Sequence, residues 1–371
     1  MKITNPPPHT YNLNPQATHS SQITTQITKT SNTSNALSLN NNPEQSEMTF
    51  HAAFTPGANE KLLAAFQGFK TRRQISVHTI APGIIKTKIH QPLNGKANNH
   101  SHPLSSLQAL MKPGSTYTRL HIIGGGDSSY VIGTKNEARP ESPIALAKQT
   151  PPGAAIINGG YFVHKDGLIS NDGSKLEIGS PIGEASHRTD NAPVPDIWKE
   201  EYGHLLIDEQ IALTSGPVLS IDGQQVTLPD HERMQYFLGE LDNPLNKYAG
   251  ALTHSSDYNE RAAISTAYSA ANEKNDTVMH ALTSNGDRSA GASMSDWQNL
   301  TNISVSSLPG QRETDNRIGS STINLDGGGS VFLGTTDDSG MTIHALGGAS
   351  SESTIRPVAN VIVSTPKTGK E

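Results

Sequence analysis

Cysteine is absent from the 371 residues, which excludes disulfide bonds, thiolate metal sites and a cysteine nucleophile. The chain also lacks an excess of basic residues. Its net charge of −6 and isoelectric point near 6.2 provide no general field that would attract nucleic acid or an anionic membrane. No run of about 18 apolar residues occurs, so we expect no membrane-spanning helix. The compartment stays open, because a chain without cysteine suits both the cytosol and export.

The first 50 residues are poor in apolar side chains and rich in Ser, Thr, Asn, Gln and Pro. Such a segment cannot bury enough apolar surface to offset its ordering entropy, so we expect residues 1–50 to be a disordered leader. The segment lacks the apolar centre of a secretory signal. Its composition resembles the leaders of bacterial type III secretion effectors, and an ordinary disordered tail is the alternative.

If the leader is an export signal, the protein is secreted and translocated into a host cell as a virulence effector. Its macromolecular partners would then be a secretion chaperone or a host protein. If the leader is a plain tail, the protein stays in the bacterial cytoplasm.

The rest of the chain divides into a helical linker (51–74), one domain (75–365) and a short tail (366–371). Within the domain, short runs rich in Val, Ile, Thr and Tyr alternate with Gly, Pro and Asp, as is typical of strands and turns. Helical patterns are fewer, and three are found: Glu141 to Gln149, Met234 to Asp242 and Ser293 to Ile303. These patterns predict an α+β fold with a mixed, strand-rich sheet core and a few helices.

Three glycine loops follow apolar runs: Ile122 to Ser129, Ile156 to Phe162 and Ile323 to Gly334. Glycine runs reach positive φ and can turn several N–H groups toward one anion. None of the loops has the GxGxxG spacing of a dinucleotide fold, and a Walker loop is absent. Taken alone, each loop is most simply a turn between two strands.

Five motifs occur in a fixed order: AIINGGYF, SGPVLSIDG, ERAAIS, INLDGGGS and RPVANVIVS. Together they resemble the phosphodiester glycosidase family, over roughly Val77 to Ser364, with little similarity between Lys165 and Ser215. The resemblance implies an enzyme that removes a sugar from a diester phosphate at the anomeric carbon.

The resemblance also implies roles for two of the three glycine loops, Ile156 to Phe162 and Ile323 to Gly334. Asp326 would lie at the anomeric carbon, as nucleophile or as the base that activates water. Hydrogen-bond donors beside it would come from Gly327, Gly328 and Ser330. The loop Ile156 to Phe162 contributes Asn158, Gly159 and Gly160, and Asn158 would orient a sugar hydroxyl or acetamido group. The alternatives are that Asp326 caps a turn and that Asn158 holds one.

Two arginines are carried over for the phosphate. Arg261 offers a planar, permanently charged fork, with a structural ion pair as its alternative role. The segment NGDRSAGASMSDW is similar to a D-G-R segment of the family but has the order N-G-D-R. It contributes Asn285 and Arg288.

A second carboxylate is expected because glycosidases usually work with two. The candidates are Asp172, Glu177, Asp222 and Glu313, of which we select Glu177. We expect no required cofactor and no catalytic metal, because the histidines show no zinc-ligand spacing. Ca²⁺ could bind Asp326 together with backbone carbonyls.

The sequence therefore predicts a hydrolase that cleaves the sugar–phosphate bond of a sugar-1-phosphodiester resembling a GlcNAc-1-phosphodiester. Its partner would be a small sugar phosphate or a glycan. The alternative is a non-catalytic effector of the same fold that binds a sugar phosphate or another protein.

Overall fold

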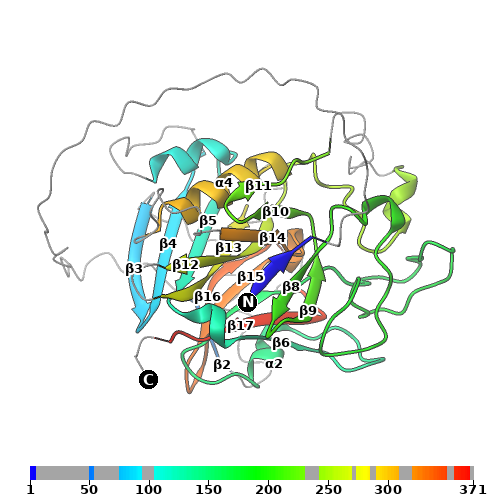
Figure 1. Ribbon diagram of the computed structural model, residues 1–371, viewed down its shortest axis with the longest axis horizontal. Coiled ribbons are helices and arrows are strands. Elements are labelled where there is room, and N and C mark those ends of the chain that lie inside the picture. Colours follow the sequence, from blue (N-terminus) through cyan, green and yellow to red (C-terminus); the bar gives the residue numbers. More distant parts are fainter. Residues whose placement is uncertain are drawn as a thin grey trace, which may run out of the picture.

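The computed structural model describes residues 1–5, 50–53, 75–93, 104–229, 242–269, 273–284, 290–308, 320–348 and 355–367. Strands dominate these residues and form three sheets (Figure 1). The α+β class is confirmed in that a few helices accompany the strands, although the fold is mostly β. The prediction of a mixed sheet is wrong, because every pairing between named strands in the described chain is antiparallel. Five of these pairs, for example β3–β4 and β15–β16, are joined by short turns, which can connect only antiparallel strands because parallel neighbours need long crossover connections.

The largest sheet has eight strands. In spatial order they are β11 (Gln224–Gln225), β10 (Val218–Ile221), β14 (Ser320–Asn324), β12 (Arg261–Ser269), β13 (Lys274–Thr283), β5 (Thr116–Ile122), β4 (Ile84–His90) and β3 (Ile75–Ala81). The second sheet has six: β2 (Phe50–Ala53), β16 (Gly340–Leu346), β15 (Phe332–Thr336), β7 (Ala155–Asn158), β17 (Asn360–Ser364) and β6 (Ser129–Gly133). The apolar runs of the sequence correspond to these strands.

The two large sheets pack face to face, and alternate residues of their strands point to opposite faces. In β12, Ala262 and Ile264 point into the core between the sheets. In β7, Ile157 joins that core, while its neighbour Ile156 packs on the outer face of the six-stranded sheet. Because both faces of these strands are buried, the sequence shows continuous apolar runs rather than a polar and apolar alternation.

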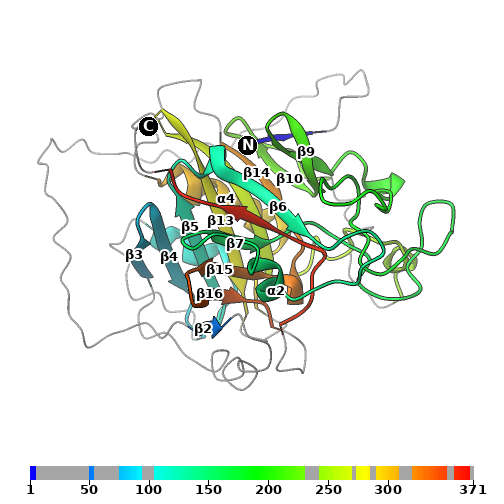
Figure 2. The ribbon, with the colours of Figure 1, turned by 90° about the horizontal axis from the view of Figure 1, so that it is seen from below.

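Helices cover the outer faces of the two sheets. The helix α4 (Met294–Ser306) and the 3₁₀ helix η2 (Ser105–Leu110) lie on the eight-stranded sheet, and the short α2 (Pro143–Ala147) lies on the six-stranded one (Figures 1 and 2). Ser293 caps α4 by accepting from the Asp296 N–H group. The predictions of these two α-helices are confirmed. The third predicted helix and the helical pattern of the linker fall almost entirely outside the described residues.

The remaining 3₁₀ turns are η3 (Gly125–Ser128), η4 (Asp196–Trp198), η6 (Pro244–Lys247) and η7 (Gly328–Ser330). No helix in the described ranges is both long and apolar enough to cross a membrane.

The smallest sheet joins the start of the chain to the middle. It consists of β1 (Lys2–Thr4), β8 (Gly203–Ile207) and β9 (Gln210–Ser215). Ile3 is buried in the core with Leu205 and Leu213. The expected disordered leader (1–50) is therefore wrong for residues 2–4, because one apolar side chain and strand pairing order them. Residues 6–49 lie outside the described part, so the comparison with secretion leaders rests on composition alone.

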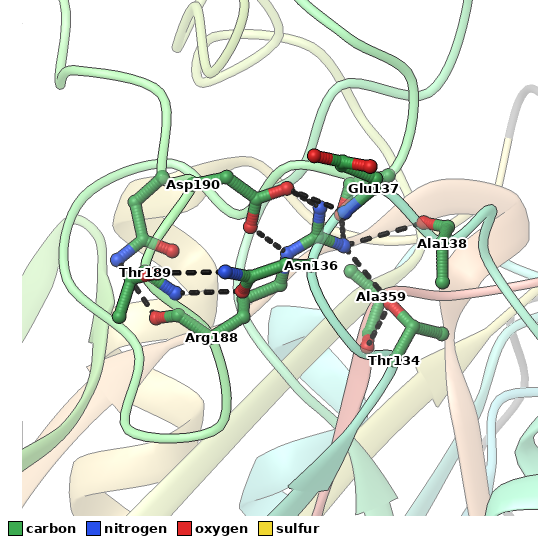
Figure 3. Close-up of polar contacts among 10 residues, drawn as sticks. Thr134, Asn136, Glu137, Ala138, Arg188, Thr189, Asp190 and Ala359 are labelled. Carbon is green, nitrogen blue, oxygen red and sulfur yellow. Dashed lines mark hydrogen bonds and ion pairs between the residues drawn. The ribbon is translucent and has the colours of Figure 1, made fainter.

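The long connection between β7 and β8 forms a wall beside the sheets with its own apolar cluster, which includes Trp198 and Tyr202. A buried arginine fastens this wall to the end of β6 (Figure 3). Arg188 forms a bidentate ion pair with Asp190 and donates to Thr134 Oγ1 at 3.1 Å and to the Gly179 carbonyl at 3.0 Å. This network lets a fully buried guanidinium replace its lost hydration.

We expect Asp190→Asn to lower the free energy of unfolding at pH 7 by roughly 1–3 kcal/mol, because it leaves the Arg188 charge buried without its counter-ion. Hydrogen bonds from Arg188 lower the pKa of Asp190 to about 2. A lowered carboxyl pKa stabilises the fold above the unfolded pKa, so the difference between the two proteins should shrink as pH falls from about 5 to 2. Urea denaturation at several pH values measures it.

The control is Asp196→Asn, which removes an exposed ion pair with Lys199. Exposed pairs contribute only about 0–1 kcal/mol, so this variant should unfold almost like the parent protein. Equal losses in the two variants would contradict the structural role of Arg188.

Candidate functional site

Two of the glycine loops, Ile156 to Phe162 and Ile323 to Gly334, meet at one end of the two-sheet core. The strand β14 of the eight-stranded sheet ends at Asn324, and β15 of the six-stranded sheet begins at Phe332. The loop that carries Asp326 therefore crosses from one sheet to the other. The strands β7 and β13 end beside it, and β12 and β17 begin there. The sequence of this loop, taken alone, suggests a simple turn between two neighbouring strands. The structure shows instead a connection between two sheets.

Asn158 joins the loop Ile156 to Phe162, in which it lies, to the loop Ile323 to Gly334. Its Nδ2 donates to the Asp326 carbonyl at 2.8 Å, and its Oδ1 accepts from the Phe332 N–H group at 3.0 Å. The Asp326 N–H group in turn donates to the Gly159 carbonyl at 3.1 Å. The Asn158 side chain is fully buried, so these contacts make it a clamp for the crossover loop. The loops pair directly rather than face each other across a pocket.

Gly159 and Gly160 use their N–H groups within the protein. The Gly159 N–H group donates to the Asn360 carbonyl at 3.0 Å, and the Gly160 N–H group donates to Asn360 Oδ1 at 3.2 Å. A Cβ atom on Gly159 would lie 1.7 Å from that oxygen. Gly159 is therefore required by close packing against β17, whereas a Cβ atom on Gly160 would lie 2.7 Å from the Thr214 carbonyl oxygen in β9. The N–H groups of the two glycines do not form the anion nest that a glycine run can provide.

Asn324 is a buried hub that the sequence analysis missed. Its Oδ1 accepts from Trp297 Nε1 of α4 at 3.1 Å, and its Nδ2 donates to the Gly216 carbonyl at 2.9 Å and to the Tyr161 hydroxyl at 3.1 Å. One side chain thus links α4, the Gly-Pro segment before β10 and the first glycine loop. The signal was its place in INLDGGGS, two residues before Asp326.

Glu260 is a second missed residue, and only 5% of it is exposed. Its Oε1 accepts from both the N–H group and the hydroxyl of Ser284 at 2.8 Å, and its Oε2 accepts from the Gly348 N–H group at 2.7 Å. Its backbone carbonyl accepts from the Gly328 N–H group at 3.0 Å. Burial raises the pKa of Glu260, while the three donors act in the opposite direction. Glu260 therefore ties three loops together and has little freedom to act on a ligand.

Asp326 is half-buried at the bend of the crossover loop. Burial raises the pKa of its carboxyl group, and the charge of Arg356, the Ser330 hydroxyl and the Gly327 N–H group counteract part of that rise. The Arg356 guanidinium lies against Gly329, because a Cβ atom there would be 3.5 Å from Nη1. Within the described chain, this guanidinium makes no hydrogen bond or ion pair. A carboxylate and a cation thus meet at the loop without saturating each other.

Two neighbours of this pair, His164 and Tyr161, are neutral at pH 7. Desolvation and the charge of Arg356 lower the pKa of His164 to about 4, which leaves its ring uncharged. Burial, together with the Asp326 charge, raises the pKa of Tyr161 well above its usual range. The site therefore offers one carboxylate, one cation and two uncharged hydrogen-bonding side chains.

Arg261 fixes a loop rather than forming the ion pair considered above. Its Nη2 donates to the carbonyls of His254 and Asp257, both at 2.8 Å, and its Nε donates to the Ala292 carbonyl at 3.1 Å. Burial lowers its pKa to about 10, so it remains charged at neutral pH. These bonds account for much of its donor fork, and its contact with a phosphate stays a prediction.

The backbone of the loop Ile323 to Gly334 explains why two of its positions are occupied by glycine. Gly328 has a φ of +56°, a value that glycine adopts without strain. A Cβ atom on Gly327 would lie 2.7 Å from the Glu260 carbonyl oxygen. Ser330 ends the 3₁₀ turn η7, and its hydroxyl is buried beside Asp326.

The structure does not support Glu177 as the partner of Asp326. Glu177 is exposed on the wall and is not among the charges that act on the pKa of Asp326. Asp172 and Asp222 are also exposed. The remaining predicted residues, Asn285, Arg288 and Glu313, lie outside the described residues. No group of three or more His, Asp or Glu side chains converges as a metal site in the part of the chain that is described.

No family model matches the chain, and no curated protein sequence matches it. Among solved structures, it is similar to the zebrafish catalytic domain of N-acetylglucosamine-1-phosphodiester alpha-N-acetylglucosaminidase, with a TM-score of 0.38 and 15% identity, over 80% of this chain and 90% of that one. A hypothetical protein from Synechocystis gives a TM-score of 0.36 and 13% identity, over 79% of this chain and 64% of that one. A protein from Burkholderia pseudomallei gives a TM-score of 0.37 and 12% identity, over 79% of this chain and 96% of that one.

Two neighbouring glycines test the packing of the crossover loop. We expect Gly327→Ala to lower the free energy of unfolding by roughly 1–3 kcal/mol, because its Cβ atom would push against the Glu260 backbone. Gly329→Ala is the matched control, since its Cβ atom would come no closer than 3.4 Å to any atom, and that nearest atom belongs to the Arg356 side chain. Chemical denaturation of both variants checks the difference. A control that is destabilised as much as Gly327→Ala would show that the loop does not depend on this contact.

Proposed function

We propose that the protein is a hydrolase that cleaves the bond between an anomeric carbon and the phosphate of a sugar-1-phosphodiester. One observation carries this proposal: the half-buried Asp326 carboxylate lies beside the Arg356 cation, whose guanidinium makes no bond within the described chain. A substrate of this class develops positive charge at the sugar carbon and negative charge on the departing phosphate. The pair supplies the complementary charges.

The two charges would divide the work. Asp326 would attack the anomeric carbon or take a proton from the attacking water, while Arg356 would hold the phosphate oxygens as they gain charge. The C–O bond breaks, the phosphate leaves as a monoester, and water supplies the new sugar hydroxyl group. A phosphodiester is already a good leaving group, which reduces the need for a second carboxylic acid.

The buried polar side chains would act as positioning residues. Asn158 holds the Asp326 carbonyl, and Asn324 holds the chain two residues earlier. Both side chains are buried, as is Ser330, so substrate contact is expected from Asp326 and Arg356 instead. The ordered motifs of the sequence support the role of Asp326 in this assignment.

A second candidate is a binding protein that recognises a sugar phosphate without cleaving it. Its support is that the described residues place no second carboxylate free to act beside Asp326, because Glu260 is occupied by three donors and Glu177 is exposed. The charges of Asp326 and Arg356 would then serve recognition only.

Turnover of GlcNAc-1-phosphodiesters separates these two functions. We expect Asp326→Asn to lower kcat/KM by about 10²-fold or more, because it removes the charge at the reacting carbon while leaving the backbone bonds of the loop in place. Glu177→Gln should retain the parent activity within about twofold if that side chain is only solvated. Sugar and phosphomonoester release would be measured by mass spectrometry.

Binding without turnover by the parent protein, across several sugars, would favour the recognition function. Loss of activity in Glu177→Gln but not in Asp326→Asn would instead reverse the assignment of the carboxylate.

The pH dependence of kcat/KM tests the pairing of Asp326 with Arg356. Asp326 acts when ionised, so activity should fall as pH drops through its raised pKa. Because the Arg356 charge lowers that pKa, Arg356→Met should move the acid limb to higher pH, and Arg356→Lys should leave it nearly in place. A limb that shifts in His164→Gln and not in Arg356→Met would assign the titration to His164.

A further inference from the structure

An exposed aromatic side chain lies at the edge of the site. Tyr258 is 42% exposed, although large apolar and aromatic residues in this protein are mostly buried. It lies two residues before Glu260, whose carbonyl accepts from the Gly328 N–H group, so its Cα atom is within about 7.6 Å of the Glu260 Cα atom. Its neighbour Asn259 has its Oδ1 atom 3.7 Å from the Cβ position of Gly328. The Tyr258 loop therefore borders the crossover loop of Asp326.

The Tyr258 loop is held in place by bonds that do not involve the tyrosine. Arg261 Nη2 binds the carbonyls of His254 and Asp257. The N–H group of Met294 donates to the Ser255 carbonyl at 2.9 Å, and Asn259 forms two backbone bonds with Ala292. A rigid loop presents its exposed ring with little further loss of entropy on binding. The buried Arg261 thus fixes the backbone of the loop that carries Tyr258.

A cation accompanies the ring. Lys112 Nζ lies 4.0 Å from the centroid of the Tyr258 ring, and the Lys112 N–H group donates to the Gly291 carbonyl at 3.0 Å. Gly291 packs against the Asn259 backbone, so the lysine is anchored to the same loop. A ring with a fixed positive charge suits a ligand that has both a flat or apolar ring face and a phosphate.

We infer that Tyr258 and Lys112 form a subsite for the group attached to the far side of the phosphate, and that this group carries a ring, either of a second sugar or of a nucleoside. The inference rests on the proposed function for the position of the phosphate. The ring of the leaving group stacks on the face of Tyr258 that Lys112 does not cover, while Lys112 adds positive charge toward the phosphate held by Arg356. Arg261 acts here as a positioning residue for the loop.

The test uses three diesters of N-acetylglucosamine 1-phosphate whose second ester group is methyl, hexosyl or uridyl. Affinities are measured by calorimetry or ligand-observed NMR on the full chain. We expect Tyr258→Ala to weaken binding of the ring-bearing diesters about three- to tenfold and to leave the methyl diester unchanged. Tyr258→Phe should retain the parent affinities. Lys112→Met should weaken the ring-bearing diesters and reduce the salt dependence of their binding.

The control is Ile197→Ala, which removes another exposed apolar side chain, in η4. It should leave all three affinities unchanged. Equal effects of Tyr258→Ala on the methyl and the ring-bearing diesters would overturn the subsite. Because binding is measured directly, the subsite can be confirmed even if no diester is hydrolysed, and hydrolysis of all three with no effect of Tyr258→Ala would reject the subsite while supporting the hydrolase. A preference for the hexosyl or the uridyl diester identifies the ring.

Discussion

The crossover from the eight-stranded to the six-stranded sheet imposes the main constraint on this protein. A chain that passes between two packed sheets carries backbone N–H and C=O groups into an environment where water cannot satisfy them. Buried side chains take over that function here, and Asn158 does so for Asp326 and Phe332. The geometry of the site follows from this requirement, because the same bonds that satisfy the backbone fix the direction of the Asp326 side chain.

The polar residues of the site fall into two classes, which differ in whether their side-chain polar atoms remain available to a ligand. Asn158, Asn324 and Glu260 are consumed by contacts within the protein. Asp326 and Arg356 are less buried, and their charges act on each other without a direct ion pair. An unsaturated pair costs stability compared with a closed salt bridge, and such a cost is common where a site must receive a ligand.

The sequence predicts the strands well because buried strands of this core appear as short apolar runs between glycine and proline turns. It also predicts that the two glycine loops belong together, since their motifs occur in order. It does not predict that the sheets are antiparallel, which depends on how distant strands meet. Glu260 was missed for a physical reason: a glutamate before a strand is usually solvated, and only the approach of Ser284 and Gly348 from other strands makes it a buried anchor.

Glu260 also determines where the chain can vary. Its carboxylate holds Ser284 and Gly348, and each of these residues directly precedes a segment outside the described ranges, 285–289 and 349–354. Ser284 and Gly348 are therefore fixed points beside the crossover loop. Changes of sequence beyond these two points would leave the contacts of Glu260 with the crossover loop in place.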